Sequence, residues 1–398
     1  MIRRIAKITG LFLSLLAVAV FAAWATSPDP TGNPASFEDA PLDPRLAPMD
    51  EALTLAQYEL EFGEAATLLV TGFDGESVTG VDLADLGADR TSYPLRDLAS
   101  LPADAITPEA LAALPTMNLP YDALLPSAPG GAAHIGTGTN FPEHAEEANS
   151  GSVFQFPKFG TATPARTTIR AREGILLDYE VELCMRFDRD IASLDDFDAA
   201  VKGVFLCGDF TNRNVLVQLA DTDNLDSGFG FSDAKSGTGH YPSGPFIVVP
   251  RDWKSFVANL RMTTSVNGDP RQGARGGEMT LDFRALAEKA LGDMAEPRFF
   301  YAGGFQPLAP EGRITTDMTL MSGTSEGVIF TPPSRADMID GVVAYILRGG
   351  PLARAGLVNT VKREFIANEL ESGHFLKPGD TVVHGSNHLG DIIVEVTG

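Results

Sequence analysis

The first regular feature of the chain is an apolar stretch, residues 8–25, which contains no charged side chain and follows three basic residues. A basic start, an apolar core and the small-residue pattern Ala23-Trp-Ala25 are typical of a cleaved export signal. A stretch of this length also reaches the lower limit for a membrane-spanning helix, so an uncleaved anchor is the alternative. We therefore predict an exported, periplasmic protein that contacts a membrane only if residues 1–25 are retained.

Polar and apolar patterning then separates two short regions from the bulk of the chain. Residues 26–50 are rich in proline and aspartate and lack periodicity, which predicts a flexible spacer. Two apolar runs, 67–73 and 76–82, flank an Asp-Gly turn and predict a β-hairpin. We assign the hairpin to a small N-terminal domain, residues 51–130, which carries no recognisable chemistry and is expected to support packing or a homodimer.

The remaining region, residues 131–398, is dominated by predicted strands. Apolar runs predict strands at 174–187, 203–209, 244–250, 257–265, 317–322 and 391–396, with a hairpin turn at Asn267-Gly268. Helical patterns occur at 193–200, 281–293 and 351–370. Strands and helices do not alternate as a doubly wound fold requires. The predicted fold class is mainly β with some α: a mixed or antiparallel β-roll that follows the small N-terminal domain.

Composition narrows the class of partner. The chain has a formal net charge of −23, which disfavours nucleic acid and anionic membrane surfaces as partners of the whole molecule. Forty glycines and 27 prolines favour turns and short strands. We expect a small-molecule ligand and no nucleic acid.

Candidate chemistry begins with two acids inside an apolar run. Glu180 and Glu182 are one residue apart, so a strand would point both side chains to the same face. Like charges this close repel unless a cation lies between them. A second apolar run ends at Asp209, which adds a third carboxylate. Three oxygen ligands suit Mg²⁺, with Mn²⁺ or Ca²⁺ as alternatives, and do not suit Zn²⁺.

A series of motifs from about residue 136 to the C-terminus resembles the fumarylacetoacetate hydrolase family. In chain order the motifs are Asn140–Glu147, Asp178–Glu182, Asp209–Arg213, Ala234–Ser236 with Pro242–Pro245, Val266–Asp269, Ser322–Thr324 and Leu376–Asp380. The family has a β-roll architecture and a metal held by carboxylates. The resemblance therefore implies that Glu180, Glu182 and Asp209 are the metal ligands.

The same resemblance implies roles for residues outside the metal site. His144 and Glu147 are three residues apart after a proline, a spacing that places both on one helical face. In the family such a pair activates water, with the carboxylate orienting the imidazole. Lys235 would be catalytic because it stabilises the negative charge of the developing enolate. Arg213 and Thr324 would bind the substrate.

Two positions depart from the family pattern. Members usually carry an acid directly after the arginine and, in hydrolases of C–C bonds, a glutamine two residues further on. Here these positions hold Asn214 and Leu216. A glutamine occurs at Gln218, which on a strand would keep the same face but lie about 6–7 Å away.

The function that the resemblance implies is a divalent-metal-dependent hydrolase that cleaves a C–C bond of an acylpyruvate or fumarylacetoacetate-like acid. The substrate would be a 2-oxo or β-dicarbonyl acid. A decarboxylase, hydratase or isomerase of the same family is an alternative. A second alternative is a catalytically idle protein that binds a metal and a dicarboxylate. Leu216, at the position of the family's glutamine, keeps this alternative open.

The only two cysteines flank the proposed metal ligands. Cys184 follows Glu182 by two residues, and Cys207 precedes Asp209 by two. If the two strands are antiparallel, Cys184 lies opposite Cys207 and a disulfide is within reach. If the strands are parallel, Cys184 lies near Thr211 and both thiols stay free.

Overall fold

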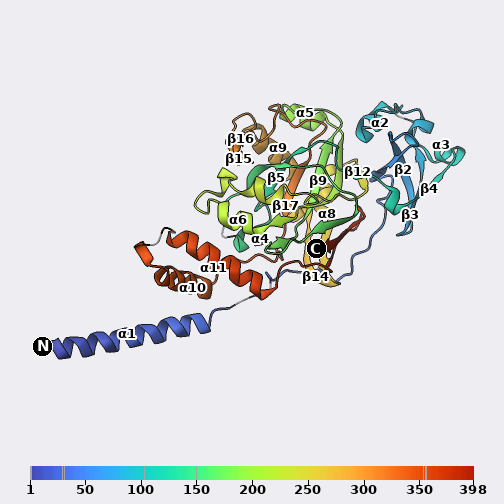
Figure 1. Ribbon diagram of the computed structural model, residues 1–398. Helices are drawn as coiled ribbons and strands as arrows, with labels where there is room; N and C mark the ends of the chain where they lie inside the picture. Colours follow the sequence, from blue (N-terminus) through green and yellow to red (C-terminus); the bar gives the residue numbers. More distant parts are fainter. Residues whose placement is uncertain are drawn as a thin grey trace. The chain divides into compact units, whose positions relative to one another are not determined.

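The computed structural model describes residues 2–28, 30, 32–102, 104–148, 150–352, 354 and 356–398, with the backbone alone for residues 2–7 (Figure 1). The chain forms two compact units. One contains residues 1–33 and 329–375, and the other contains residues 34–328 and 376–398. The second unit holds every residue that we predicted to carry chemistry.

The larger unit is built on a ten-stranded sheet. Its order is β4 (Met117–Pro120), β3 (Ser77–Asp82), β2 (Ala65–Phe73), β1 (Ala52–Glu59), β12 (Phe246–Pro250), β10 (Lys202–Gly208), β9 (Val181–Phe187), β17 (Leu320–Thr324), β5 (Ala133–Gly138) and β6 (Phe154–Phe159). Neighbouring strands are antiparallel except β17 and β5, which are parallel. The predicted hairpin forms β2 and β3, and β1 pairs with β12, so one sheet continues from residues 51–130 into residues 131–398.

A second sheet has five strands, in the order β14 (Asp269–Arg275), β13 (Arg261–Val266), β18 (Thr381–Ser386), β19 (Asp391–Thr397) and β7 (Arg166–Arg170). Two further sheets have two strands each: β11 (Thr211–Asn212) with β8 (Leu177–Asp178), and β15 (Phe299–Tyr301) with β16 (Gly304–Gln306). The predicted Asn267-Gly268 turn joins β13 to β14. The predicted class, a mixed and mainly antiparallel β fold with some helix, is confirmed.

Short helices connect the strands of this unit. They are α2 (Pro94–Ser100), α3 (Pro108–Ala113), α4 (Pro142–Glu147), α5 (Leu194–Ala199), α6 (Arg213–Leu219), α7 (Phe231–Lys235), α8 (Trp253–Asn259) and α9 (Phe283–Leu291). Single 3₁₀ turns are η1 (Leu83–Leu86), η2 (Tyr121–Ala123), η3 (Leu225–Ser227) and η4 (Gly276–Glu278). The other unit is helical, with α1 (Ile2–Ala25), α10 (Arg335–Leu347), η5 (Gly350–Leu352) and α11 (Leu357–Ser372).

Helix caps explain two places where an apolar run is helical. The predicted strand 257–265 is confirmed from residue 261 onward as part of β13, but its start lies in α8, because the Asp252 side chain accepts a hydrogen bond from the Ser255 N–H and starts a helix there. Residues after Arg213 form α6 and not a strand, because Asn212 caps them in the same way. Each cap precedes residues with good apolar patterning, so the apolar pattern alone did not distinguish strand from helix.

Residues 36–45, part of the predicted spacer, make specific contacts with the larger unit. The Arg45 N–H donates to the Asn387 carbonyl at 2.9 Å. Arg261 Nη1 donates to the carbonyl of Ala40 at 2.6 Å. The Ser36 N–H donates to Oε1 of Glu326 at 3.1 Å. These contacts fix the path of this segment along the unit.

Strands β9 and β10 are joined by a disulfide between Cys184 and Cys207, with their Cα atoms 6.1 Å apart. The antiparallel alternative is therefore confirmed. The predicted register was wrong by two residues, because Glu182 lies opposite Cys207, and Cys184 lies opposite Phe205. The two cysteines are diagonal neighbours on one face, a separation that a disulfide spans.

Candidate metal centre and catalytic dyad

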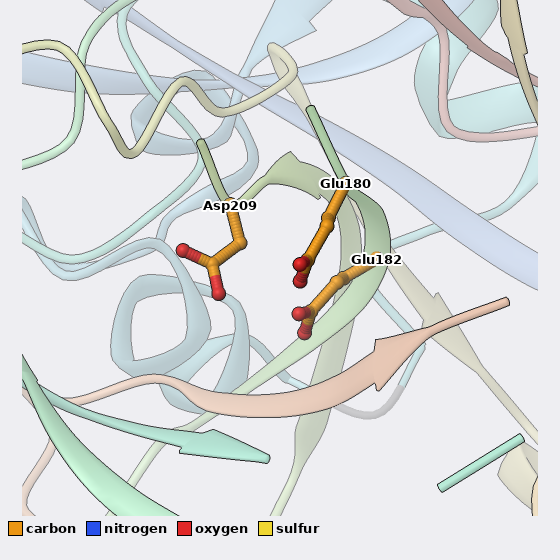
Figure 2. A group of neighbouring side chains, drawn as sticks. All are labelled: Glu180, Glu182 and Asp209. Carbon is orange, nitrogen blue, oxygen red and sulfur yellow. The ribbon is translucent and has the colours of Figure 1, made fainter. Parts of the chain in front are cut away.

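The three predicted metal ligands come together at the end of the β9–β10 pair. Glu180 lies just before β9, Glu182 lies within it, and Asp209 directly follows β10. The Asp209 N–H donates to the Glu180 carbonyl at 2.9 Å, which fixes this end of the pair. Each of the three residues offers a carboxylate oxygen within 4.8 Å of the others, and all three are buried. Figure 2 shows the carboxylates pointing toward one another.

Two buried lysines neutralise much of this charge. The Nζ atom of Lys235 donates to Oε2 of Glu180 at 2.6 Å and to Oδ2 of Asp209 at 2.8 Å. Lys158 Nζ donates to the other Asp209 oxygen, Oδ1, at 2.6 Å. Burial would raise the pKa of Asp209, but the two ammonium groups outweigh it and hold that pKa below its usual value. Asp209 is therefore an ionised carboxylate between two cations.

Sequence analysis missed Lys158. It lies on β6, is fully buried and also donates to the carbonyls of Lys235 and His240. The available signal was a lysine inside the apolar run Phe154–Phe159, because a lysine buried within a strand needs a counter-ion. Its partner Asp209 lies 51 residues away in the sequence, so the pairing follows only from the sheet.

Arg213, predicted to bind substrate, lies beside the same cluster. Its Nε atom donates to Oδ2 of Asp178 at 2.8 Å, and its Nη2 atom donates to Oε1 of Glu180 at 2.8 Å. Burial would lower the pKa of Arg213, but Asp178 and Glu180 raise it overall. The site thus contains four carboxylates and three cations, which leaves one net negative charge when all are ionised.

Glu182 is the carboxylate of the cluster that no cation contacts in the part of the chain that the structure describes. Its Oε2 atom accepts the Gly323 N–H at 2.8 Å, whereas its buried Oε1 atom has no hydrogen-bond partner among the described residues. Burial, followed by the charges of Asp209 and Glu180, raises the pKa of Glu182 well above its usual value. An unpaired buried carboxylate oxygen beside two further acids has the chemistry of a hard-cation ligand, so the donor set fits Mg²⁺, Mn²⁺ or Ca²⁺.

The predicted dyad is formed on α4. His144 Nδ1 lies 2.9 Å from Oε2 of Glu147, and the other oxygen of Glu147, Oε1, accepts the Gly327 N–H at 3.0 Å. The start of the helix is anchored by Asn140, whose Nδ2 atom donates to the Ser322 carbonyl at 2.8 Å. The ring orientation is therefore set by a carboxylate that is itself held by the backbone.

One loop binds both parts of the site. The Gly323 N–H holds Glu182, and the Gly327 N–H holds Glu147. Both glycines have a positive φ, of 80° and 97° respectively, which other residues rarely adopt. A Cβ atom at Gly327 would also meet the Arg271 carbonyl oxygen at 2.0 Å. Four residues of chain span at most about 15 Å, so the dyad and the carboxylates are anchored close to each other.

The hydroxyl of Thr324, predicted to bind substrate, has two protein partners. Its Oγ1 atom donates to the Val181 carbonyl at 2.8 Å and accepts from Gln272 Nε2 at 2.9 Å. Gln272 also accepts the Val181 N–H at 3.2 Å through its Oε1 atom. Thr324 and Gln272 therefore fix the start of β9. The backbone of the preceding residue, Gly323, supplies the contact to Glu182.

The glutamine position of the family lies on α6 and is filled by Leu216, which is buried. On a strand, Gln218 would share the face of Leu216. On a helix two residues correspond to about 200° of rotation, so Gln218 points away from Leu216 and is exposed. Asn214, at the acid position, accepts the Leu176 N–H at 2.7 Å and donates to the Gly174 carbonyl at 2.6 Å.

Comparisons with known proteins identify the family of this chain. Residues 133–397 match the family model for the C-terminal domain of fumarylacetoacetate hydrolase. An uncharacterised protein of Staphylococcus epidermidis is 31% identical over 162 residues, and a Staphylococcus aureus protein is 30% identical over the same length. The match covers 39% of this chain and about half the length of these curated relatives.

Solved structures share the fold at low sequence identity. Fumarylacetoacetate hydrolase from Exiguobacterium antarcticum has a TM-score of 0.55 and 17% identity, with 87% of this chain and 99% of that chain covered. The 2-hydroxyhepta-2,4-diene-1,7-dioate isomerase from Mycobacterium marinum has a TM-score of 0.50 and 17% identity, with 87% and 98% covered. The family model spans well over half of the sequence, and the chain belongs to the fumarylacetoacetate hydrolase family.

Proposed function

We propose that this protein is a divalent-metal-dependent hydrolase that cleaves a C–C bond of an acylpyruvate-like 2-oxo or β-dicarbonyl acid. The observation that carries the proposal is the buried cluster of Glu180, Glu182 and Asp209, in which Oε1 of Glu182 has no partner among the described residues. Mg²⁺ is the proposed ion, and Mn²⁺ is the alternative with the same ligands. When bound, the ion would polarise the oxygens of the 2-oxo acid.

The chain's own residues divide the remaining tasks. If Nδ1 of His144 donates its proton to Glu147, Nε2 is the ring nitrogen that accepts a proton from water. Lys235 and Arg213 lie beside the carboxylates and would stabilise the negative charge of a developing enolate. The Gly323–Gly327 loop holds Glu182 and Glu147 in one arrangement and so preserves their relative positions.

A second function is favoured by one observation, the buried Leu216 at the position where the family's C–C hydrolases carry glutamine. Loss of that amide removes one donor for a developing oxyanion. A decarboxylase, hydratase or isomerase needs the enolate but not the attack of water on a distal carbonyl. A catalytically idle protein would keep the carboxylates for binding alone.

The decisive experiment supplies purified full-length protein with Mg²⁺ or Mn²⁺ and a panel of acylpyruvates and 2-oxo enoic acids. Loss of enolate absorbance with release of pyruvate and a carboxylic acid supports the hydrolase. Loss of absorbance with an isomeric or decarboxylated product supports the second function instead. Glu182→Gln serves as the inactive control, and turnover that this variant retains would contradict a role for the cluster.

A further inference from the structure

The helical unit is the part of the molecule in which apolar side chains face outward. Residues Ile8–Ala25 of α1 form a span long and apolar enough to cross a membrane, and none of this span is buried. Ten exposed large hydrophobic side chains lie on α1, and nine more lie between Met338 and Leu370. The rest of the chain whose side chains are described exposes only four.

The hairpin of α10, η5 and α11 places these side chains on its outer surface. Met338, Val342 and Ile346 recur every four residues and form one stripe along α10. Leu347, which is 80% exposed, and Leu352, which is 95% exposed, lie at the tip of the hairpin. A helix pair in water normally turns such residues inward.

Two polar side-chain pairs link the helices of the hairpin, one part-buried and one at the surface, where Arg348 is half exposed. Asn368 Nδ2 donates to Oδ1 of Asp337 at 2.9 Å, and Arg348 pairs with Glu364 at 2.7 Å. The helices approach closely at Gly341, where a Cβ atom would meet the Cα atom of Val361 at 2.6 Å. A polar contact between the helices, close packing at glycine and many exposed apolar side chains are features of helices surrounded by lipid.

The tip of the hairpin differs in charge from the whole chain, whereas the full hairpin, residues 335–372, carries five basic and five acidic residues. Residues 341–363 contain no aspartate or glutamate and four basic residues, although the chain has 53 acids and a formal net charge of −23. Basic side chains that flank exposed apolar ones are complementary to an anionic bilayer surface. The net charge of the molecule conceals this local character.

The hairpin starts where α1 ends. The Ala336 N–H donates to Oγ of Ser27 at 3.0 Å, and Arg335 Nη2 donates to the Thr26 carbonyl at 3.3 Å. Helix α10 also lies against α1 within the same unit (Figure 1). If α1 crosses a bilayer, these hydrogen bonds place the start of α10 at the point where α1 leaves it.

We propose that the α10–α11 hairpin enters an anionic lipid bilayer beside α1, with Ile346, Leu347 and Leu352 among the acyl chains and the basic residues at the headgroups. The two elements then form one membrane-bound unit, with α1 retained as an anchor. This inference does not depend on the proposed reaction, because its residues lie outside the metal centre and the dyad.

The test uses the full-length protein, with retention of residues 1–25 checked by intact mass, in vesicles of phosphatidylethanolamine and phosphatidylglycerol at a 3:1 ratio. Leu347→Cys is labelled with an environment-sensitive fluorophore under non-reducing conditions. The native cysteines are buried in a disulfide and do not react. We expect a blue-shifted emission that lipids carrying a spin label on the acyl chain quench several-fold more than they quench a label at Phe62→Cys.

Phe62 is the matched control because it is an equally large apolar side chain, 91% exposed, in the other unit. Equal quenching at the two positions would overturn the proposal. A blue shift at Leu347 without lipid quenching, together with energy transfer between labelled copies, would assign the surface to a second copy of the chain and also overturn it. Because Leu347 is exposed, the substitution is not expected to unfold the protein; circular dichroism checks this.

Discussion

The carboxylate cluster and the His144–Glu147 dyad are the two halves of the proposed site, and they are built differently. The cluster lies on paired strands inside a ten-stranded sheet, where its charges are fully surrounded by protein. The dyad lies on a six-residue helix, and its side chains are 12% and 11% exposed. Strand register fixes the first half, whereas hydrogen bonds from the Gly327 N–H to Glu147 and from Asn140 at the start of α4 hold the second.

This difference predicts that the two halves respond differently to mutation. Charges buried in a sheet must be balanced, so changes in the cluster alter the free energy of unfolding as well as ion binding. A single His–Glu pair on a six-residue helix, still partly open to solvent, contributes less to folding than the buried charges, so changes there should alter turnover more than stability. Four changes, to Lys158, the disulfide, the dyad and Glu182, test this division.

The largest effect is expected from Lys158→Met. The variant removes one of the two ammonium groups on Asp209 and leaves a buried carboxylate incompletely paired. Breaking a buried ion pair in this way costs about 3–5 kcal/mol of unfolding free energy, which urea denaturation measures. A saturating divalent ion should restore part of the loss.

The matched control is Lys202→Met. Lys202 is also buried, but its Nζ atom donates to the backbone carbonyls of Ala200 and Asp198. Its removal should cost only about 1 kcal/mol. If both variants lost the same unfolding free energy, Lys158 would act through packing alone. The cluster would then not differ from other buried sites in its contribution to stability.

The disulfide tests whether strand register supports the cluster. Cys184 and Cys207 are 23 residues apart, and a loop of that length gives about 3 kcal/mol of stabilisation in the chain-entropy model. The double variant Cys184→Ala with Cys207→Ala should therefore unfold at lower urea concentration and bind the metal more weakly, because Glu182 lies opposite Cys207. Unchanged metal affinity would show that the sheet alone fixes Glu182.

The dyad should show the opposite behaviour. His144→Ala should lower turnover by about 10²-fold or more, equivalent to about 2.7 kcal/mol, while ion binding and urea stability change little. Glu147→Gln should show a smaller loss of the same kind, since it orients the ring without taking the proton. Glu143→Gln, an exposed neighbour on the same helix, is the control. Turnover within a few-fold of the parent protein would remove His144 from the mechanism.

The cluster could be predicted from sequence because it depends on short-range rules. Glu180 and Glu182 are separated by one residue, so on a strand their side chains point to the same face of the sheet. Asp209 follows an apolar run, which places it at the end of a strand. The cysteine pair followed from the same reasoning even though the register was wrong by two residues, because a shift of two preserves the face of a strand.

The parts that could not be predicted depend on long-range pairing or on caps. Lys158 reaches Asp209 only because β6 is placed by the sheet, and no local pattern reports that. Asn212 turns the next residues into a helix and so moves Gln218 to another face. The α10 helix was missed although Ser334 and Asp337 form a capping box. Its large apolar residues are exposed, so its sequence lacks the regular alternation of a buried apolar face with a polar face that was used to predict helices.

Glu182→Gln should give the smallest change in the stability of the metal-free protein. It should also give the clearest difference between the protein with and without a bound ion. Glu182 has two acids beside it and no cation in contact among the described residues. A neutral amide relieves this repulsion and should stabilise the metal-free protein by about 1 kcal/mol. The parent protein should gain about 2.7 kcal/mol when Mg²⁺ or Mn²⁺ is present at 100 times its Kd, and the variant should lose this gain. Glu326→Gln is the control, since burial also raises the pKa of Glu326 but this residue lies outside the cluster.

Thermal unfolding with and without the ion measures both effects. A metal-dependent rise in Tm that survives in Glu182→Gln would show that the ion binds elsewhere, and the division between a binding half and a proton-transfer half would then fail.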